Sequence, residues 1–307
     1  MNIHLYTICW NDAEMLGFFF RHYDRFVDRY VFYDDGSDAP TLDILRSHPR
    51  AELRRLQRAF PDSFLLSAPL QQNAMWKESR GQADWVVVTS IDEHLYHPDL
   101  PAYLQACRRD GITIIPGLGY QMISEHFPAP DALLCRDCPW GAPYDPMNKL
   151  GIFDPDAIEE TNYIGGRHSA RPTGRVRFPP RDELLNLHYK YLGIDYIRRR
   201  NADLLAKLGS GNDVLPAHMS YARDTAQVLA AIEEWQRASD NISDPALQPW
   251  KSHRDTSRHT WWTHPPWWRV RWWHPQWWTD AISPSVKLPL VRAARAAGLM
   301  PKLDHVQ

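Results

Sequence analysis

The sequence predicts an α/β fold, a mostly parallel sheet with flanking helices, followed by a tryptophan-rich C-terminal tail. Apolar, β-branched and aromatic runs alternate with stretches of helical periodicity over residues 1–120, as in sheets whose strands are joined by helices. Two of these runs, 29–38 and 83–96, stop abruptly at carboxylates. A buried parallel strand ends in this way when it brings polar groups to the carboxyl edge of a sheet, where ligands bind. Nine of the 14 tryptophans lie between residues 250 and 278, in a separate compositional zone.

Strands and helices are expected to alternate through the first part of the chain. Asn11 or Asp12 can cap the first helix, and Asp38 followed by Pro40 gives the second helix a cap and a first-turn proline. The expected strands are 3–9, 30–33, 51–56, 85–91 and 111–116. The expected helices are 14–26, a short one over 42–45, 72–81 and 100–109.

The second part of the chain is less regular. Residues 125–182 are rich in Pro, Gly, Asp and Arg, and long irregular segments in compact domains are often substrate loops. The three arginines from Arg198 to Arg200 are expected on a solvated helix face. The expected elements are strands over 149–153, 175–178 and 184–189 and helices over 194–208 and 228–235.

Composition narrows the class of protein. The net charge of -2 gives no bias toward polyanions, so no nucleic-acid partner is expected. Four cysteines without a disulfide-like spacing fit a reducing compartment. The first residues, 1–8, have the pattern of a strand and not of a signal peptide, and no apolar run approaches the ~18 residues of a membrane span. We therefore expect a cytoplasmic protein.

The first acidic motif is Tyr33-Asp-Asp-Gly-Ser-Asp38, at the end of the second expected strand. A carboxylate of Asp34 or Asp35 can accept a hydrogen bond from a nucleobase or a ribose hydroxyl, and Gly36 allows a tight turn. The same pattern also suits an ordinary strand-to-helix turn with a capping aspartate. Taken alone, this motif leaves both interpretations open.

The second acidic motif is Ser90-Ile-Asp-Glu-His94, after the tryptophan-led strand. Adjacent hard oxygen ligands at a strand end suit Mg²⁺ or Mn²⁺ bridging a diphosphate. Strand alternation predicts that Asp92 shares a face with Ser90 and His94, with Glu93 on the opposite face. A solvated acidic turn is the alternative.

The two motifs, in this order and on this strand pattern, resemble those of GT-A fold glycosyltransferases, specifically the glycosyltransferase family 2-like group. Many members carry a Lys-Asn-Glu motif before the first helix, where this chain has Trp10-Asn-Asp12. Residues 33–38 resemble a Tyr-Asp-x-x-Ser-x-Asp segment, and residues 90–94 resemble an Asp-x-Asp-Glu-Phe motif. Asn162-Tyr163, Gly166, His168 and His188-Tyr189 resemble later elements, so the similarity covers roughly residues 1–200.

The resemblance implies a Rossmann-like GT-A fold and a transferase for a UDP- or GDP-sugar donor and a glycan or lipid-linked acceptor, in surface glycan or lipopolysaccharide assembly. It divides the catalytic domain into a donor-binding half over 1–120 and an acceptor-side half over 121–245, followed by an extension over 246–307. It implies a divalent cation, Mn²⁺ or Mg²⁺, held by Asp92. Because Ser90 replaces the first aspartate of the Asp-x-Asp motif, the cation is expected to bind more weakly, and a metal-independent enzyme is the alternative.

Individual roles follow from the same resemblance. The residues expected to contact the donor are Thr7, Asp12, Asp34, Asp35, Lys77 and Ser90. The residues expected at the metal are Asp92, His94 and His188. The general base is sought among Asp145, Glu159, Glu160 and His168. The alternative for Lys77 is a position on a solvated helix face. The alternative for the histidines is a structural role with satisfied hydrogen bonds.

Two other functions remain open. A nucleotidyltransferase that makes a sugar nucleotide would use a related sheet. It normally carries a Gly-rich loop with Arg or Lys after the first strand, whereas residues 9–14 contain neither a glycine nor a basic residue. A non-enzymatic, Trp-rich carbohydrate- or membrane-binding protein on a transferase scaffold is the other alternative. A hydrolysis assay on nucleotide sugars separates these functions.

The C-terminal tail has paired tryptophans that are interrupted by prolines over 261–278, so it cannot form one helix. Paired indoles with Arg269 and Arg271 suit a bilayer interface. The alternatives are a tail that wraps the catalytic domain and rings that stack on sugars. The first interpretation predicts a protein that is peripheral on the inner face of the membrane.

Overall fold

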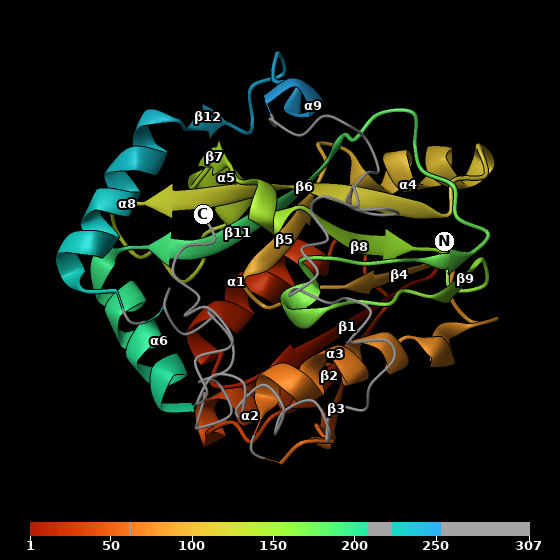
Figure 1. Ribbon diagram of the computed structural model, residues 1–307, viewed down its shortest axis with the longest axis horizontal. Coiled ribbons are helices and arrows are strands. Elements are labelled where there is room, and N and C mark those ends of the chain that lie inside the picture. The colour runs from red at the N-terminus through yellow and green to blue at the C-terminus, as the bar shows by residue number, and fades with distance from the viewer. Residues whose placement is uncertain (62, 208–220, 222, 253–307) are drawn as a thin grey trace, which may run out of the picture.

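The computed structural model describes residues 1–61, 63–207, 221 and 223–252, and its centre is a ten-stranded sheet (Figure 1). The strands of this sheet are β1 (Ile3–Cys9), β2 (Arg29–Asp34), β3 (Ala51–Arg55), β4 (Trp85–Val88), β5 (Glu93–Tyr96), β6 (Ile114–Ser124), β7 (Trp140–Pro143), β8 (Lys149–Phe153), β11 (Leu184–Leu192) and β12 (Asp240–Asn241). A second small sheet pairs β9 (Ile158–Glu160) with β10 (Thr173–Gly174).

Helices connect and flank these strands. The α-helices are α1 (Ala13–Tyr23), α2 (Ala39–Ser47), α3 (Phe64–Ala74), α4 (Leu100–Arg109), α5 (Leu134–Asp137), α6 (Ile194–Lys207), α8 (Thr225–Arg237) and α9 (Pro249–Ser252). Three short 3₁₀ turns are η1 (Lys77–Ser79), η2 (Asp145–Met147) and η3 (Gly165–Arg167).

The sheet has a parallel half and a mixed half. Strands β3, β2, β1 and β4 lie side by side in that order and all run parallel, which is the strand order of doubly wound nucleotide-binding folds. Strand β8 is antiparallel to both β4 and β6, and β11 runs parallel to β6 and antiparallel to β5. The predicted α/β class with a large sheet and flanking helices is confirmed, and the parallel arrangement is concentrated in β1 to β4.

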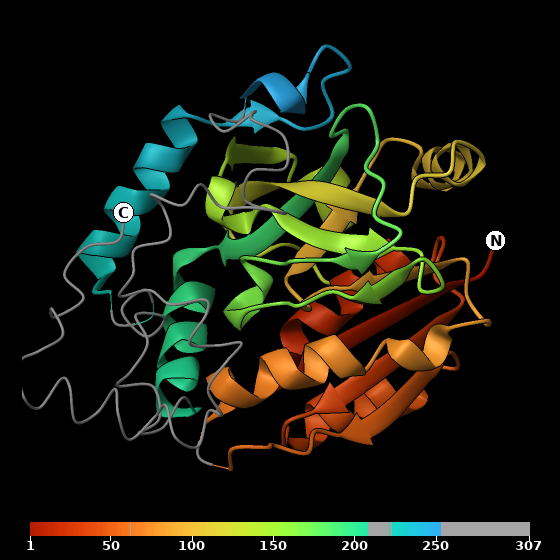
Figure 2. The same cartoon turned by 45° about the vertical axis from the view of Figure 1, so that its right-hand side comes forward.

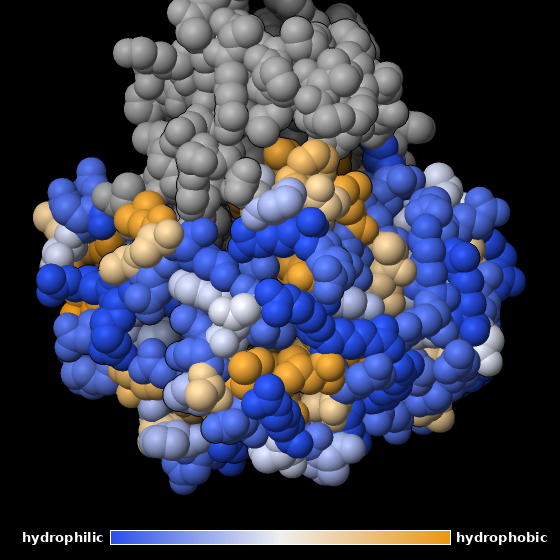
Figure 3. Space-filling model, turned by 90° about the horizontal axis from the view of Figure 1, so that it is seen from below, coloured by the Kyte–Doolittle hydropathy of each residue, from blue (hydrophilic) through white to orange (hydrophobic). Residues whose placement is uncertain are grey.

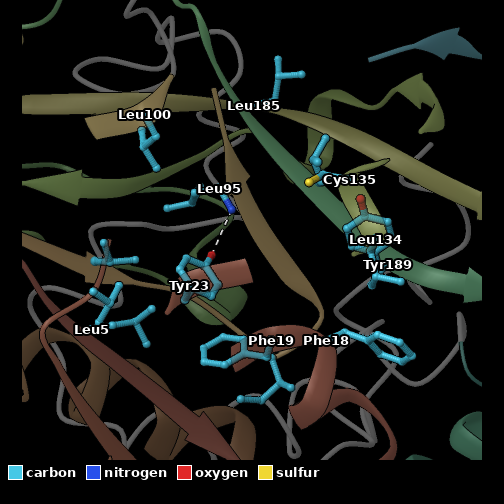
Figure 4. Close-up of a cluster of buried hydrophobic side chains, with 14 of the residues drawn as sticks. Leu5, Phe18, Phe19, Tyr23, Leu95, Leu100, Leu134, Cys135, Leu185 and Tyr189 are labelled. Atoms are coloured by element: carbon cyan, nitrogen blue, oxygen red, sulfur yellow. Dashed lines mark hydrogen bonds between the residues drawn. The ribbon is translucent and has the colours of Figure 1, made fainter. Parts of the chain in front are cut away.

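Alternating side chains bury both faces of the parallel half. Leu5 packs with α1 residues on one face, whereas Tyr6 belongs to the cluster on the other face, where Trp76 meets Phe153. On the first face Tyr23 of α1 points toward the start of β5 (Figure 4), and its hydroxyl accepts a hydrogen bond of 2.9 Å from the Leu95 N–H. The same hydroxyl donates to the carbonyl of Glu93, at 2.8 Å. Helix α1 thereby fixes the segment that follows the second acidic motif.

Several predicted elements differ from the observed ones. Strand β4 ends at Val88 and the chain turns at Ser90, whose carbonyl accepts from the Glu93 N–H at 3.1 Å, before β5 begins. The predicted helix over 72–81 is α3 followed by η1, because Ser63 caps a helix that starts earlier and ends at Ala74. The predicted strand over 175–178 is wrong, since the strand in that region is β10.

Other predicted elements agree closely with the structure. Strands β1 and β8 and helix α4 have the predicted bounds, and Asp38 caps α2 by accepting from the Thr41 N–H at 3.2 Å. Within the described ranges, no helix is both long enough and apolar enough to cross a bilayer. Figure 3 shows one face of the molecule as largely hydrophilic, with small, separate hydrophobic areas on its described part. The tail from 253 onward lies outside the described residues.

Candidate functional site

The carboxyl ends of β1, β2 and β4 meet at one edge of the parallel half, and each is followed by an acidic residue. Asp12 follows β1, Asp34 and Asp35 lie at the end of β2, and Asp92 lies in the turn after β4. The strand order changes direction between β1 and β4, and in open α/β sheets ligands bind outside the carboxyl ends of the strands at such a point. Helix α6 stands at the end of the sheet toward which β6 and β11 point (Figures 1 and 2).

Asp92 faces His188 of β11. The His188 Nε2 atom lies 3.3 Å from Asp92 Oδ2, and the Asp92 carbonyl accepts a hydrogen bond of 2.7 Å from the Tyr189 N–H. Burial by itself would raise the pKa of Asp92, but His188 outweighs burial when its ring is protonated and lowers the pKa. The structure therefore brings together two of the three predicted metal-site residues.

A glutamine fixes the orientation of the His188 ring. The Gln121 side-chain amide donates to the His188 carbonyl at 3.0 Å, so its oxygen faces the His188 Nδ1 atom, 2.8 Å away. Because an amide oxygen only accepts, Nδ1 carries the proton and Nε2 presents a lone pair to Asp92 in the neutral ring. This is the tautomer in which an imidazole binds a metal ion through Nε2.

Glu93 is a buried structural carboxylate beside this pair. It accepts from Lys149 Nζ at 2.6 Å and from Arg167 Nη2 at 2.5 Å, and all three side chains are at most 4% exposed. Burial would raise the pKa of Glu93, but Arg167 and Lys149 lower it far below its usual range. Arg167 also donates to the Val88 carbonyl at 2.6 Å and to Ser90 Oγ at 3.3 Å. The ion triad thus shapes the turn that presents Asp92.

Asp12, expected at the donor site, is held by helix α6. Arg200 contacts its carboxylate and donates to the carbonyls of Trp10 at 3.0 Å and Asn11 at 2.9 Å. Burial raises the pKa of Asp12 to about 6, although Arg200 acts in the opposite direction. The prediction that Arg200 lies on a solvated helix face is wrong, because its guanidinium group closes the loop after β1.

The two aspartates at the end of β2 have different partners. Asp34 accepts from the N–H groups of Gly36 and Ser37, both at 3.0 Å, and so forms the turn that the first motif predicts. Asp35 binds the Arg58 guanidinium through two hydrogen bonds, at 2.7 and 2.5 Å. Lys207 donates to the Asp35 carbonyl at 2.6 Å. Both carboxylates thus lie at the predicted edge, and Asp35 is paired there with the cations of Arg58 and Lys207.

Other predicted residues lie away from Asp92. Lys77 and Glu160 form an ion pair of 2.5 Å that joins η1 to β9. Thr7 is fully buried in the middle of β1. His94 is fully buried and packs against the rings of His22 and Tyr189, with centroid distances of 4.7 and 5.0 Å. The predicted shared face of Asp92 and His94 is wrong, because the turn after Val88 interrupts the strand.

Two candidates for the general base are placed near one another. His168 is exposed and donates through Nδ1 to the Pro146 carbonyl, 2.6 Å away, which brings it next to the Asp145 turn. Although part of the side chain reaches solvent, nearby Lys149 and then desolvation by the surrounding atoms lower the pKa of His168 to about 4, so the ring is neutral at pH 7. Glu160, another candidate for the general base, forms an ion pair with Lys77 instead.

Sequence reasoning missed Gln121, Lys190 and the ion triad of Glu93. Lys190 follows His188 by two residues on β11, and its Nζ atom lies 4.3 Å from the centroid of the Tyr221 ring. Burial lowers the pKa of Lys190 to about 8, although Asp92 acts in the opposite direction. No local signal marks Lys190, because the pairing of β11 with β6 shifts register between His188 and Tyr191, so simple alternation does not hold there.

The donor set at Asp92 fits a divalent cation. In the described part of the chain, no three His, Cys, Asp or Glu side chains converge to form a complete cage. Asp92 and His188 together offer a hard oxygen and an imidazole nitrogen. Mg²⁺ is commonly held by one or two carboxylates together with substrate phosphates and water. The pair therefore fits a cation that binds together with a diphosphate.

No protein-family model and no curated protein matches the chain. Among solved structures, it is similar to glucosyl-3-phosphoglycerate synthase from Mycobacterium tuberculosis in complex with Mn²⁺, uridine diphosphate and glucosyl-3-phosphoglycerate, with 16% identity, a TM-score of 0.27 and coverage of 39% of this chain and 44% of that chain. It is also similar to 4-diphosphocytidyl-2C-methyl-D-erythritol synthase, with 11% identity, a TM-score of 0.28 and coverage of 51% and 77%. The first match spans less than half of that synthase, and likenesses at these TM-scores carry no argument about the site.

Proposed function

We propose that the chain is a glycosyltransferase that moves a sugar from a nucleotide-sugar donor to an acceptor hydroxyl. The observation that carries the proposal is the Asp92–His188 pair, at the carboxyl edge of a sheet whose β3-β2-β1-β4 half has the strand order of nucleotide-binding folds. The resemblance of the two acidic motifs to family 2-like glycosyltransferases supports the same activity. A glycan or lipid-linked acceptor remains a prediction from that resemblance.

Each residue of the site has its own role in the proposed reaction. Asp92 and His188 would hold the cation, and Gln121 keeps the His188 Nε2 atom available for it. A bound Mn²⁺ or Mg²⁺ neutralises the charge that develops on the leaving nucleoside diphosphate. His168 is a neutral imidazole whose Nδ1 proton is committed to the Pro146 carbonyl, so its Nε2 atom can accept the proton of the acceptor hydroxyl.

The decisive experiment measures hydrolysis of UDP- and GDP-sugars by the purified chain with Mn²⁺, with Mg²⁺ and with EDTA. We expect release of nucleoside diphosphate from one donor, loss of this activity in EDTA and at least a hundredfold loss in Asp92→Asn, since the charge at the leaving group is then not neutralised. Asp145→Asn tests the second base candidate in parallel. Wild-type turnover in Asp92→Asn would reject the metal assignment, and formation of a sugar nucleotide from a sugar phosphate and a nucleoside triphosphate would favour a nucleotidyltransferase.

A further inference from the structure

We propose that Lys190 is an oxyanion-binding residue of this site, and that it contacts a phosphate oxygen of the ligand that reaches the Asp92–His188 pair. The inference rests on the proposed transferase and deepens it, because it names the group that recognises the anionic part of the donor. Its starting point is the position of Lys190 on β11, two residues beyond His188 and therefore next to the carboxyl edge.

The ammonium group of Lys190 has aromatic neighbours in place of an acceptor. Within the described ranges its contacts are the ring of Tyr221, 4.3 Å from Nζ, and the ring of Tyr191, 5.8 Å from Nζ, and no carboxylate lies within 4.0 Å. Among the described residues, the other half-buried or buried lysines each meet a carboxylate: Lys77 meets Glu160, Lys149 meets Glu93, and Lys207 meets Asp35.

A half-buried ammonium with three donors and no acceptor is costly, because ring faces replace only part of the hydration that the charge has lost. The cost is offset when a ligand supplies charged oxygens. Phosphate is the group that lysine binds in such places, as a point charge and not through a planar fork.

A cavity lies next to Tyr221. Tyr221, whose ring lies against the Lys190 ammonium, is one of the residues of a cavity of about 720 Å³ between α6 and α8, and Lys190, Asp92 and His188 are not among the described residues that line it. A volume of this size is typical of small-molecule sites. Arg198, Arg199 and Arg223 line this cavity together with Asp195 and Asp224, so charges of both signs face it. An anion at Lys190 would therefore be bound mainly by the ammonium itself, next to the Asp92–His188 pair.

The test uses inorganic pyrophosphate with Mg²⁺ as the probe and isothermal titration calorimetry of the full chain as the readout. Lys190→Met keeps the volume and the contact with the Tyr221 ring but removes the charge, and we expect affinity to fall about ten- to hundredfold. Lys190→Arg should restore most of the affinity because it restores the cation. Lys251→Met, which removes an exposed lysine on α9, is the matched control and should bind as the wild type does.

The outcomes separate this inference from the proposed function. Equal pyrophosphate affinity in wild type and Lys190→Met overturns the assignment of Lys190, and donor hydrolysis by the wild type would leave the transferase standing. A wild type that binds no pyrophosphate overturns the assignment as well, and absence of donor hydrolysis then rejects the transferase separately. Thermal melts of the variants identify any loss of affinity that arises from unfolding. If Lys190→Met is unfolded, the pyrophosphate affinity of Lys190→Arg decides: near wild-type affinity supports the assignment, and lost affinity in a folded Lys190→Arg overturns it.

Discussion

The Nε2 atom of His188 lies 3.3 Å from Oδ2 of Asp92, although the proton of the neutral ring is held on Nδ1 by Gln121. Two lone pairs face each other across this distance and repel unless a cation or an added proton lies between them. The pair is therefore arranged to receive positive charge, and the residue that arranges it is an uncharged amide on the neighbouring strand β6.

Gln121→Met should release the His188 ring. Without the amide oxygen, the proton moves to Nε2 and is donated to Asp92, so we expect Mn²⁺ affinity to fall about tenfold or more, as for other residues that orient metal ligands. Electron paramagnetic resonance gives the Mn²⁺ affinity, and ¹⁵N chemical shifts of the ring give the tautomer. Gln121→Glu keeps an acceptor at the same place and is the control. Unchanged ring shifts in Gln121→Met would contradict the prediction.

His94→Phe should leave the Mn²⁺ affinity unchanged, because His94 is fully buried and packs among aromatic rings. A weaker affinity would restore His94 as a ligand.

The same variant should be less sensitive to acid. Burial lowers the pKa of His94 well below its usual value and that of neighbouring His22 to about 4. The unfolded chain, with histidine pKa values near 6.5, therefore binds more protons between about pH 6.5 and 4, so the wild type loses stability as the pH falls through this window. Urea unfolding at pH 7 and pH 5 measures the loss. Exposed His126→Phe should keep the wild-type pH dependence.

Glu93→Gln should destabilise the fold by about 3–5 kcal/mol, because it leaves the buried cations of Lys149 and Arg167 without their counter-charge. The exposed Glu52, which pairs with Arg29 and Arg54, provides the control, and Glu52→Gln should cost no more than about 1 kcal/mol. Urea unfolding of both variants measures the two changes in the free energy of unfolding. Equal losses of unfolding free energy in the two variants would show that the buried triad stabilises the fold no more than the surface pairs of Glu52 do.

Truncation after residue 252 tests the tail. Eight tryptophans are removed, while every residue proposed for the donor lies before position 208. We expect donor hydrolysis to persist and binding to vesicles containing anionic lipid to be lost, since indole rings with interleaved arginines favour a bilayer interface. Flotation of the full and truncated chains with vesicles measures membrane binding, and a thermal melt of each measures stability. If the full chain does not float and the truncated form melts much lower, the tail wraps the catalytic domain instead.

The sequence predicts the parallel half of the fold well because its strands are buried on both faces and end at carboxylates. Strand β1 and the cap of α2 at Asp38 follow from local chemistry alone. The turn that ends β4 at Val88 does not, because it depends on Arg167, which reaches Val88 from 79 positions further along the chain. Period-two alternation therefore grouped Asp92 with His94 wrongly, although it placed Glu93 and His94 on opposite faces as observed.

The site is predictable where a motif carries it and hidden where distant residues complete it. Asp92 and His188 could be chosen from the sequence, since each ends or continues a recognisable run. Gln121 and Lys190 could not, because their roles come from the pairing of β11 with β6 and from a ring at Tyr221. Arg200 looked like an ordinary surface arginine because nothing local indicates its contact with Asp12.

The contact between Arg200 and Asp12 joins residues 188 positions apart. During synthesis the loop after β1 leaves the ribosome long before its guanidinium partner has been translated. Until then the acidic edge at Asp12 lacks the cation that closes it, and contacts between such distant positions form slowly. A nascent chain that ends before α6 thus presents this edge without its guanidinium partner, although strands β1 to β4 have already been made.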